Sequence, residues 1–144
     1  MSDTTRKDSD TSKERRARGA RMIGEVYAGM LSADPEKPTG DAFFDLMIEN
    51  LFSEIWSRDV MSIRDRRLLL MGAIAAQAQN DVYEMQCMAT LKNAELTVEQ
   101  LREIPILMTQ YIGYPKTTGL RNATEKAIHN FKKAHSANEN KDKK

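Results

Sequence analysis

The sequence contains few of the features that mark several common classes of protein. Cys87 is its single cysteine, which excludes an internal disulfide and a CxxC redox pair. Aromatic residues make up 6% of the chain and the formal net charge is +1. We therefore expect neither the stacking platform nor the basic surface of a nucleic-acid-binding protein. No stretch of about 18 apolar residues occurs, which predicts no membrane-spanning helix. The N-terminus lacks the apolar segment of a secretory signal, so we expect a cytoplasmic protein.

The composition is that of one globular domain. Of the 144 residues, 40% are hydrophobic and 30% are charged. The polar residues 1–11 and 136–144 cannot bury enough apolar surface to offset the entropy of ordering, so we expect two disordered tails. The sequence thus predicts one helical domain over residues 12–135.

Apolar residues recur at helical spacing in six segments, which predicts an all-α bundle of about six helices. Ser62 and Thr97 are expected to cap two of these helices, each with a partner three residues on, and Asn80 or Asp81 to cap another. Pro105 predicts a kink. The expected helices span residues 12–31, 41–57, 62–77, 80–93, 97–112 and 116–133.

The third and fourth segments form the expected centre of the bundle. Residues 68–76 have no polar gap, so this helix should be buried on nearly every side. Gly72 is expected to let another helix approach closely. The turn at residues 77–80 is short, so the next helix should pack beside it in antiparallel orientation. That helix mixes apolar and polar residues, and any chemistry is expected there.

Three arginines in the first turn of the third helix oppose the helix dipole, which is a local cost. They are Arg64, Arg66 and Arg67. A guanidinium fork could bind the carboxylate of a ligand, or it could pair with acidic neighbours or across a subunit interface. Both interpretations are open for Arg66, and ion pairing is favoured for the other two. Cys87, in a methionine-rich helix, is interpreted as a small core residue rather than a nucleophile.

Several segments together resemble the carboxymuconolactone decarboxylase family of the alkylhydroperoxidase D-like superfamily. They are SEIWSRDVMSIRDRRLLLMGAIAA, LKNAELTVEQLREI and YIGYP with the helix after it. The resemblance implies an all-helical subunit, a ring-shaped homo-oligomer (a hexamer or trimer) and a small pocket near a subunit boundary. In its aromatic-degradation branch, members decarboxylate a carboxylated muconolactone without a cofactor.

The chain departs from the pattern of that branch at the expected catalytic positions. A Glu and a His four residues apart are typical of the family decarboxylases, and these positions hold Val82 and Gln86. A further position, commonly Gln or His, holds Leu107. The peroxidase branch uses a CxxC pair, and thiol–disulfide chemistry needs a second thiol. Peroxiredoxin activity is therefore disfavoured.

Two hypotheses for function follow. The first is a cofactor-independent, lyase-type enzyme that acts on a small carboxylated lactone or related metabolite. The second is a non-catalytic oligomer of the same fold that binds a small ligand or a protein. For the enzyme, the candidate catalytic residues are Gln86, Glu54 and Tyr111. The candidate substrate-binding residues are Arg66, Arg64, Val82, Met85, Leu107 and Tyr114. No metal-ligand spacing occurs, and His129 and His135 are expected at the surface.

Overall fold

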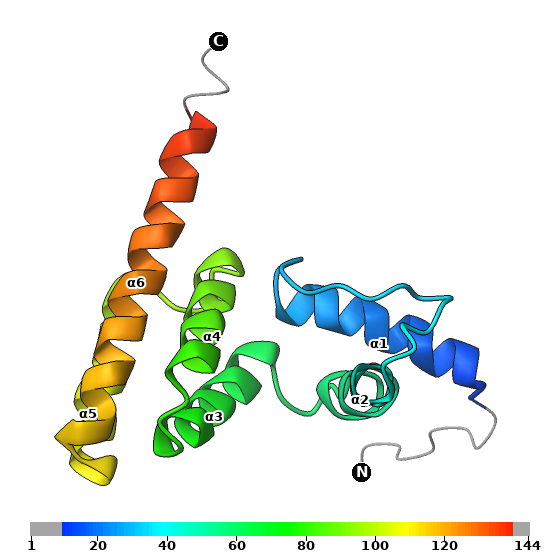
Figure 1. The fold of residues 1–144 in the computed structure, drawn as a ribbon, viewed down its shortest axis with the longest axis horizontal. Helices are drawn as coiled ribbons and strands as arrows, with labels where there is room; N and C mark the ends of the chain where they lie inside the picture. The colour runs from blue at the N-terminus through cyan, green and yellow to red at the C-terminus, as the bar shows by residue number, and fades with distance from the viewer. Residues whose placement is uncertain (1–9, 140–144) are drawn as a thin grey trace. The chain divides into compact units, whose positions relative to one another are not determined.

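A computed structural model of the chain describes residues 10–139, which form six α-helices, one π-helix and no β-strand (Figure 1). The predicted all-α fold is confirmed. The chain divides between Val60 and Met61 into two compact units, each with an apolar core of its own. The sequence predicts one domain over residues 12–135. Among residues 10–139, every helix is too short or too polar to cross a lipid bilayer.

Most of the two predicted disordered tails, residues 1–9 and 140–144, lies outside the described residues. Where the tails overlap the described part, the structure differs from the prediction. Thr11 caps the first helix through a capping box with Glu14. Residues 136–139 continue the last helix. Both segments gain order as extensions of a helix rather than by burying side chains of their own.

The first unit contains α1 (Ser12–Val26), α2 (Ala42–Leu46) and the π-helix η1 (Met47–Trp56). The helix predicted over residues 12–31 ends at Val26, because Ala28 and Gly29 adopt positive φ angles of 50° and 76°. The predicted helix at 41–57 is confirmed, but most of it has π geometry, with the wider i→i+5 hydrogen bonding.

Close packing between α1 and η1 depends on Gly19. A Cβ atom at this position would overlap the backbone carbonyl of Ile48. Buried side chains of both helices surround this contact, among them Ile23, Val26 and Phe52. Gly19 therefore lets the two backbones approach to a distance that no other residue permits.

Two arginines of α1, Arg16 and Arg18, make polar contacts inside the first unit. Arg16 is only 3% exposed and donates to the Asp34 carbonyl at 3.0 Å and to the Asp45 carboxylate at 3.0 Å. The Thr39 N–H and the Arg16 guanidinium both lower the pKa of the Asp45 carboxyl. Arg18 donates to the Ser53 carbonyl at 2.9 Å. These arginines join α1 to the segments that follow it in the first unit.

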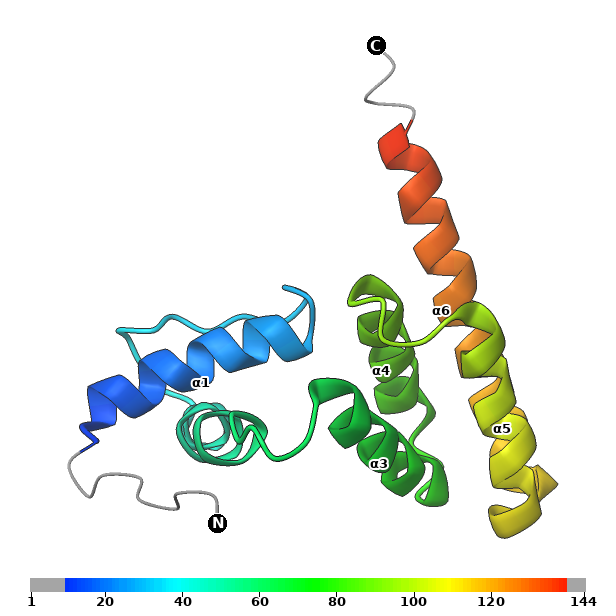
Figure 2. The ribbon, with the colours of Figure 1, turned by 180° about the vertical axis from the view of Figure 1, so that it is seen from behind.

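The second unit contains α3 (Ile63–Ala76), α4 (Asn80–Lys92), α5 (Val98–Ile112) and α6 (Tyr114–Glu139). Figures 1 and 2 show α4 between α3 and α6. The apolar core is formed by residues of all four helices and of the loop after α4, including Met71, Tyr83, Leu96, Leu101 and Leu120.

The prediction that the third helix is buried on nearly every side is wrong, and α4 takes the central place. In α3 the buried residues are Arg67, Met71, Ile74 and Ala75, on one side, whereas Leu69 is 65% exposed. A Cβ atom at Gly72 would meet nothing within 4 Å, so the close approach expected there does not occur. Uniformly apolar composition did not distinguish the core side of this helix from its exposed side.

The α5–α6 hairpin positions the candidate site described below. Thr97 and Gln100 form the predicted capping box, and α5 continues through Pro105 to end at Gly113, whose φ is 85°. The predicted cap at Asn80 or Asp81 is absent, since the N-cap of α4 is Gln79 and makes no side-chain bond. Asn80 instead packs against α6, where a Cβ atom at Gly119 would overlap its side chain. The hairpin is thereby held close to α4.

Candidate functional site

Arg67 is at the centre of a buried polar network that joins α3 to the loop after α4. Its side chain is 1% exposed, and its Nε and one terminal nitrogen donate to the two Glu95 carboxylate oxygens at 2.6 and 3.1 Å. The other terminal nitrogen donates to Gln86 Oε1 at 2.7 Å. Asn93 also donates to Glu95, at 3.2 Å. Paired guanidinium and carboxylate groups with further hydrogen bonds are the form in which buried charges are tolerated.

This network places Gln86, a predicted catalytic residue, inside the second unit. Gln86 is 1% exposed, and its amide oxygen is committed to Arg67. Val82, four residues earlier, is 39% exposed. The two positions that carry the Glu and His of the resembled decarboxylases thus differ in access to solvent. A substrate could not reach the Gln86 side chain without disturbing the buried network.

The other two arginines of α3 lie nearer the surface. Ser62 caps the helix as predicted, accepting from the Asp65 N–H at 3.0 Å. Arg64 donates to the Glu95 carbonyl at 3.1 Å and pairs with Asp65 at 3.2 Å, which confirms the interpretation of ion pairing. Arg66 is half-buried. Its predicted role in binding a carboxylate stays a prediction.

The remaining predicted site residues do not share one pocket. Glu54 belongs to η1 of the first unit, where its carboxylate accepts from Arg18 at 2.7 Å. Tyr111, a candidate catalytic residue, lies on α5 and is 79% exposed. Leu107, a candidate substrate-binding residue on the same helix, is 56% exposed. A shallow hollow of about 200 Å³ beside α3 and α5 includes Leu107 and Arg64. Met85 is half-buried on α4.

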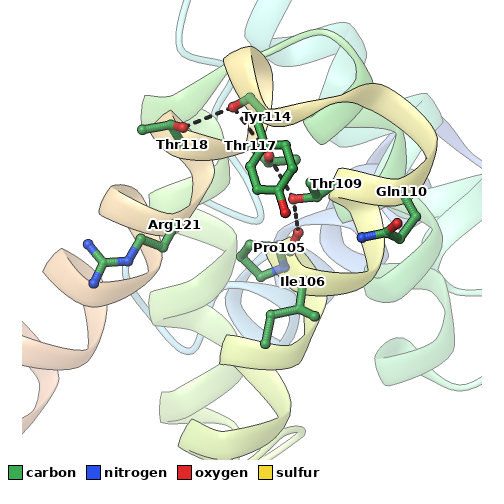
Figure 3. A pocket seen from close by; sticks show the side chains of 8 residues that line it. All are labelled: Pro105, Ile106, Thr109, Gln110, Tyr114, Thr117, Thr118 and Arg121. Carbon is green, nitrogen blue, oxygen red and sulfur yellow. Dashed lines mark hydrogen bonds between the residues drawn. The ribbon is translucent and has the colours of Figure 1, made fainter.

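An open pocket of about 260 Å³ lies between α5 and α6. One predicted substrate-binding residue, Tyr114, lines it, and Figure 3 shows the Tyr114 ring lying across it. Pro105 and Ile106 form its apolar wall on α5. Gln110 and Arg121 add polar groups at its edges. A mainly apolar hollow with a few polar groups is the usual form of a small-molecule site.

Threonines supply the remaining wall of this pocket. Thr109 donates to the Pro105 carbonyl at 2.7 Å, and its hydroxyl oxygen lies 2.8 Å from that of Thr117. Thr118 donates to the Tyr114 carbonyl at 2.9 Å. Each hydroxyl is thus bonded within the protein. The donors left to face a ligand are the Tyr114 phenol, the Gln110 amide and the Arg121 guanidinium.

A second hollow of about 220 Å³ continues the pocket along the same two helices. The two share Pro105, Ile106 and Arg121. The second hollow is bounded by a bidentate ion pair, in which Arg102 donates to both Glu125 carboxylate oxygens at 2.8 and 2.9 Å. This pair holds the pKa of the Glu125 carboxyl below its usual range. Together, the two hollows form one groove along the hairpin.

Cys87 is a core residue, as predicted. Its side chain is fully buried, and the burial raises the pKa of the thiol to about 12. Burial thus disfavours the thiolate, which is the form that redox and nucleophilic chemistry need. Among residues 10–139, no three His, Cys, Asp or Glu side chains are grouped so that they could hold a metal ion.

Five polar or hydroxyl residues of the α5–α6 pocket were not predicted from the sequence. They are Thr109, Gln110, Thr117, Thr118 and Arg121. A signal for part of this set is present, because Thr109 and Thr117 lie four residues before and four residues after Gly113. In a hairpin that turns at Gly113, these two positions face one another.

We found no similarity to any family model, curated protein or solved structure for this chain.

Proposed function

We propose that this chain is a carboxymuconolactone decarboxylase-like protein of the cytoplasm that binds a small, mainly apolar metabolite between α5 and α6. The observation that carries the proposal is the pocket of about 260 Å³ at this position. Its wall of Pro105 and Ile106 gives an apolar ring or chain a surface to cover. The buried network around Gln86 favours this binding role over catalysis at the family's usual positions.

Two neighbouring apolar residues on α5 provide a matched test. Ile106 lines the pocket and is 59% exposed, whereas Leu107 lies outside it and is 56% exposed. We expect Ile106→Asn to weaken binding of the neutral probe 2-naphthamide about fivefold. This corresponds to losing about 1 kcal/mol of apolar contact. Leu107→Asn should leave the affinity unchanged.

The measurement is equilibrium dialysis of the full chain with 2-naphthamide. Circular dichroism of both variants should match the unmodified protein, since each change is at an exposed position. Equal affinities for all three proteins, or equal weakening by both variants, would contradict binding in the α5–α6 pocket.

We also propose that the protein assembles as a homo-oligomer, a hexamer or trimer. Large apolar side chains remain exposed in each unit, including Phe43 at 80%, Leu69 at 65% and Tyr111 at 79%. Exposed apolar surface of this extent is typical of an interface. Sedimentation equilibrium should therefore give a mass three or six times that of the chain. A monomer at micromolar concentration would contradict the proposal.

Decarboxylation of a bound acid is a second candidate function, and the place of Tyr114 favours it. The Tyr114 ring lies across the pocket, and its phenol can donate a proton. Loss of CO₂ from a carboxylated lactone leaves a carbanion or dienolate that must be protonated, which is a task for a general acid. In this second candidate function, Tyr114 is the proton donor, in place of the residues that the family resemblance expects at positions 82 and 86.

A further inference from the structure

Arg121 differs from three other arginines of the second unit in making no ion pair among residues 10–139. Arg67 is paired with Glu95, Arg64 with Asp65 and Arg102 with Glu125. Among residues 10–139, the polar contact of Arg121 is with the Asn122 amide oxygen, at 3.5 Å, and none of the ion pairs includes it. Its charge is thus available to an anion.

The groove around Arg121 carries a net positive charge. Its charged lining groups are Arg102, Arg121 and Glu125, which sum to +1. Glu125 is fully engaged by Arg102, and the Arg121 charge adds to the lowering of its pKa. Because that carboxylate is already satisfied, it leaves Arg121 as the cation that a ligand would meet.

The position of Arg121 along the groove suggests how a ligand would lie. Arg121 borders both hollows, beside the apolar residues Pro105 and Ile106. Figure 3 shows the guanidinium at the edge of the pocket, on the side away from the Tyr114 ring. Arginine commonly extends its stem along apolar surface and keeps its head in water. A ligand could therefore cover the apolar wall and still reach the guanidinium with a charged group.

We infer that Arg121 is the anion-recognising residue of the α5–α6 pocket, and that the ligand is a small carboxylic acid with an apolar ring or chain. The inference rests on the proposed binding function and adds the chemical class of the ligand. The carboxylate lies at the mouth of the pocket, against Arg121, and the apolar body lies on Pro105 and Ile106. A second polar group of the ligand would meet the Tyr114 phenol or the Gln110 amide.

A pair of probes that differ only in charge tests this inference. The acid 2-naphthoate and the neutral 2-naphthamide share the same ring system. We expect the unmodified protein to bind the acid about fivefold more tightly, since an exposed ion pair contributes up to about 1 kcal/mol. In Arg121→Gln, the two probes should bind with equal affinity.

Lys133→Gln is the matched control, because it removes the same charge from an exposed position on the same helix, outside the pocket. This variant should keep the fivefold preference for the acid, and raising the salt concentration should reduce that preference. Equal binding of acid and amide by the unmodified protein would overturn the inference and leave the pocket function standing. If Arg121→Gln kept the fivefold preference for the acid, the inference about Arg121 would also be overturned, and the pocket function would still stand. Binding of neither probe would contradict both.

Discussion

Replacing Arg67 with methionine is expected to destabilise the protein by about 3–5 kcal/mol, the usual cost of removing one partner from a buried ion pair. The change leaves the Glu95 carboxylate, which is 9% exposed, without its cation, and it leaves the Gln86 oxygen without its donor. Urea unfolding followed by circular dichroism measures the loss. The transition should move to lower urea concentration with little change in slope.

Arg64→Met is the control for this prediction, because Arg64 lies on the same helix and donates to the same loop but is 44% exposed. We expect this variant to lose at most about 1 kcal/mol. The double variant Arg67→Met, Glu95→Met should recover much of the stability lost by the single change, since no charge is then left unpaired. Similar losses for Arg64→Met and Arg67→Met would show that the Arg67 network is not buried as described.

The second large effect is expected at Gly19. Alanine here would place a methyl group on the Ile48 carbonyl, which is backbone and cannot turn aside. The α1–η1 pair must then separate, at a cost of about 2–3 kcal/mol or more, against a gain in helix propensity of about 1 kcal/mol. We therefore expect a net loss of stability in thermal unfolding of Gly19→Ala.

Gly24 on the same helix provides the opposite expectation. A Cβ atom there would meet nothing within 4 Å, so Gly24→Ala should stabilise the protein by about 0.5–1 kcal/mol. The two substitutions are chemically identical and differ only in their surroundings. If both variants were stabilised, the close approach of α1 and η1 would be disproved.

The elements that were predicted correctly from the sequence are those set by local signals. The capping box of Thr97 and Gln100 and the end of α5 at Gly113 both depend on residues a few positions apart. The π geometry of η1 was not predicted, because its buried residues Ile48, Phe52 and Trp56 recur every four positions, which ordinary helical spacing also allows. Close packing on Gly19 is a tertiary feature, and the sequence offers no periodic signal for it.

The central helix was misjudged for a related reason. Residues 68–76 are apolar throughout, so hydrophobicity indicated burial on every side. In the structure, α4 is more buried than α3. Its polar residues Gln86 and Thr90, which are themselves buried, lower the hydrophobicity of its sequence. Those polar groups are satisfied by Arg67 and by a backbone carbonyl, respectively. A pairing of this kind, between residues 19 positions apart, cannot be derived from local pattern.

The candidate site was predicted only in part. Tyr114 was expected in a ligand site and lines the α5–α6 pocket. Arg121 was missed because a single arginine in a charged helix resembles any solvated residue. Its distinguishing property is the absence of a carboxylate partner among the described residues, and that becomes visible only when Arg102 and Glu125 are seen to pair with each other.

The most direct test of the central claim is a crystal structure of the full chain with bound 2-naphthoate. We predict that the naphthalene ring lies against Pro105 and Ile106 between α5 and α6, with its carboxylate within hydrogen-bonding distance of Arg121. A ring bound beside Gln86 on α4, with the Arg67–Glu95 pair opened to admit it, would contradict the account and return the site to the positions implied by the family resemblance.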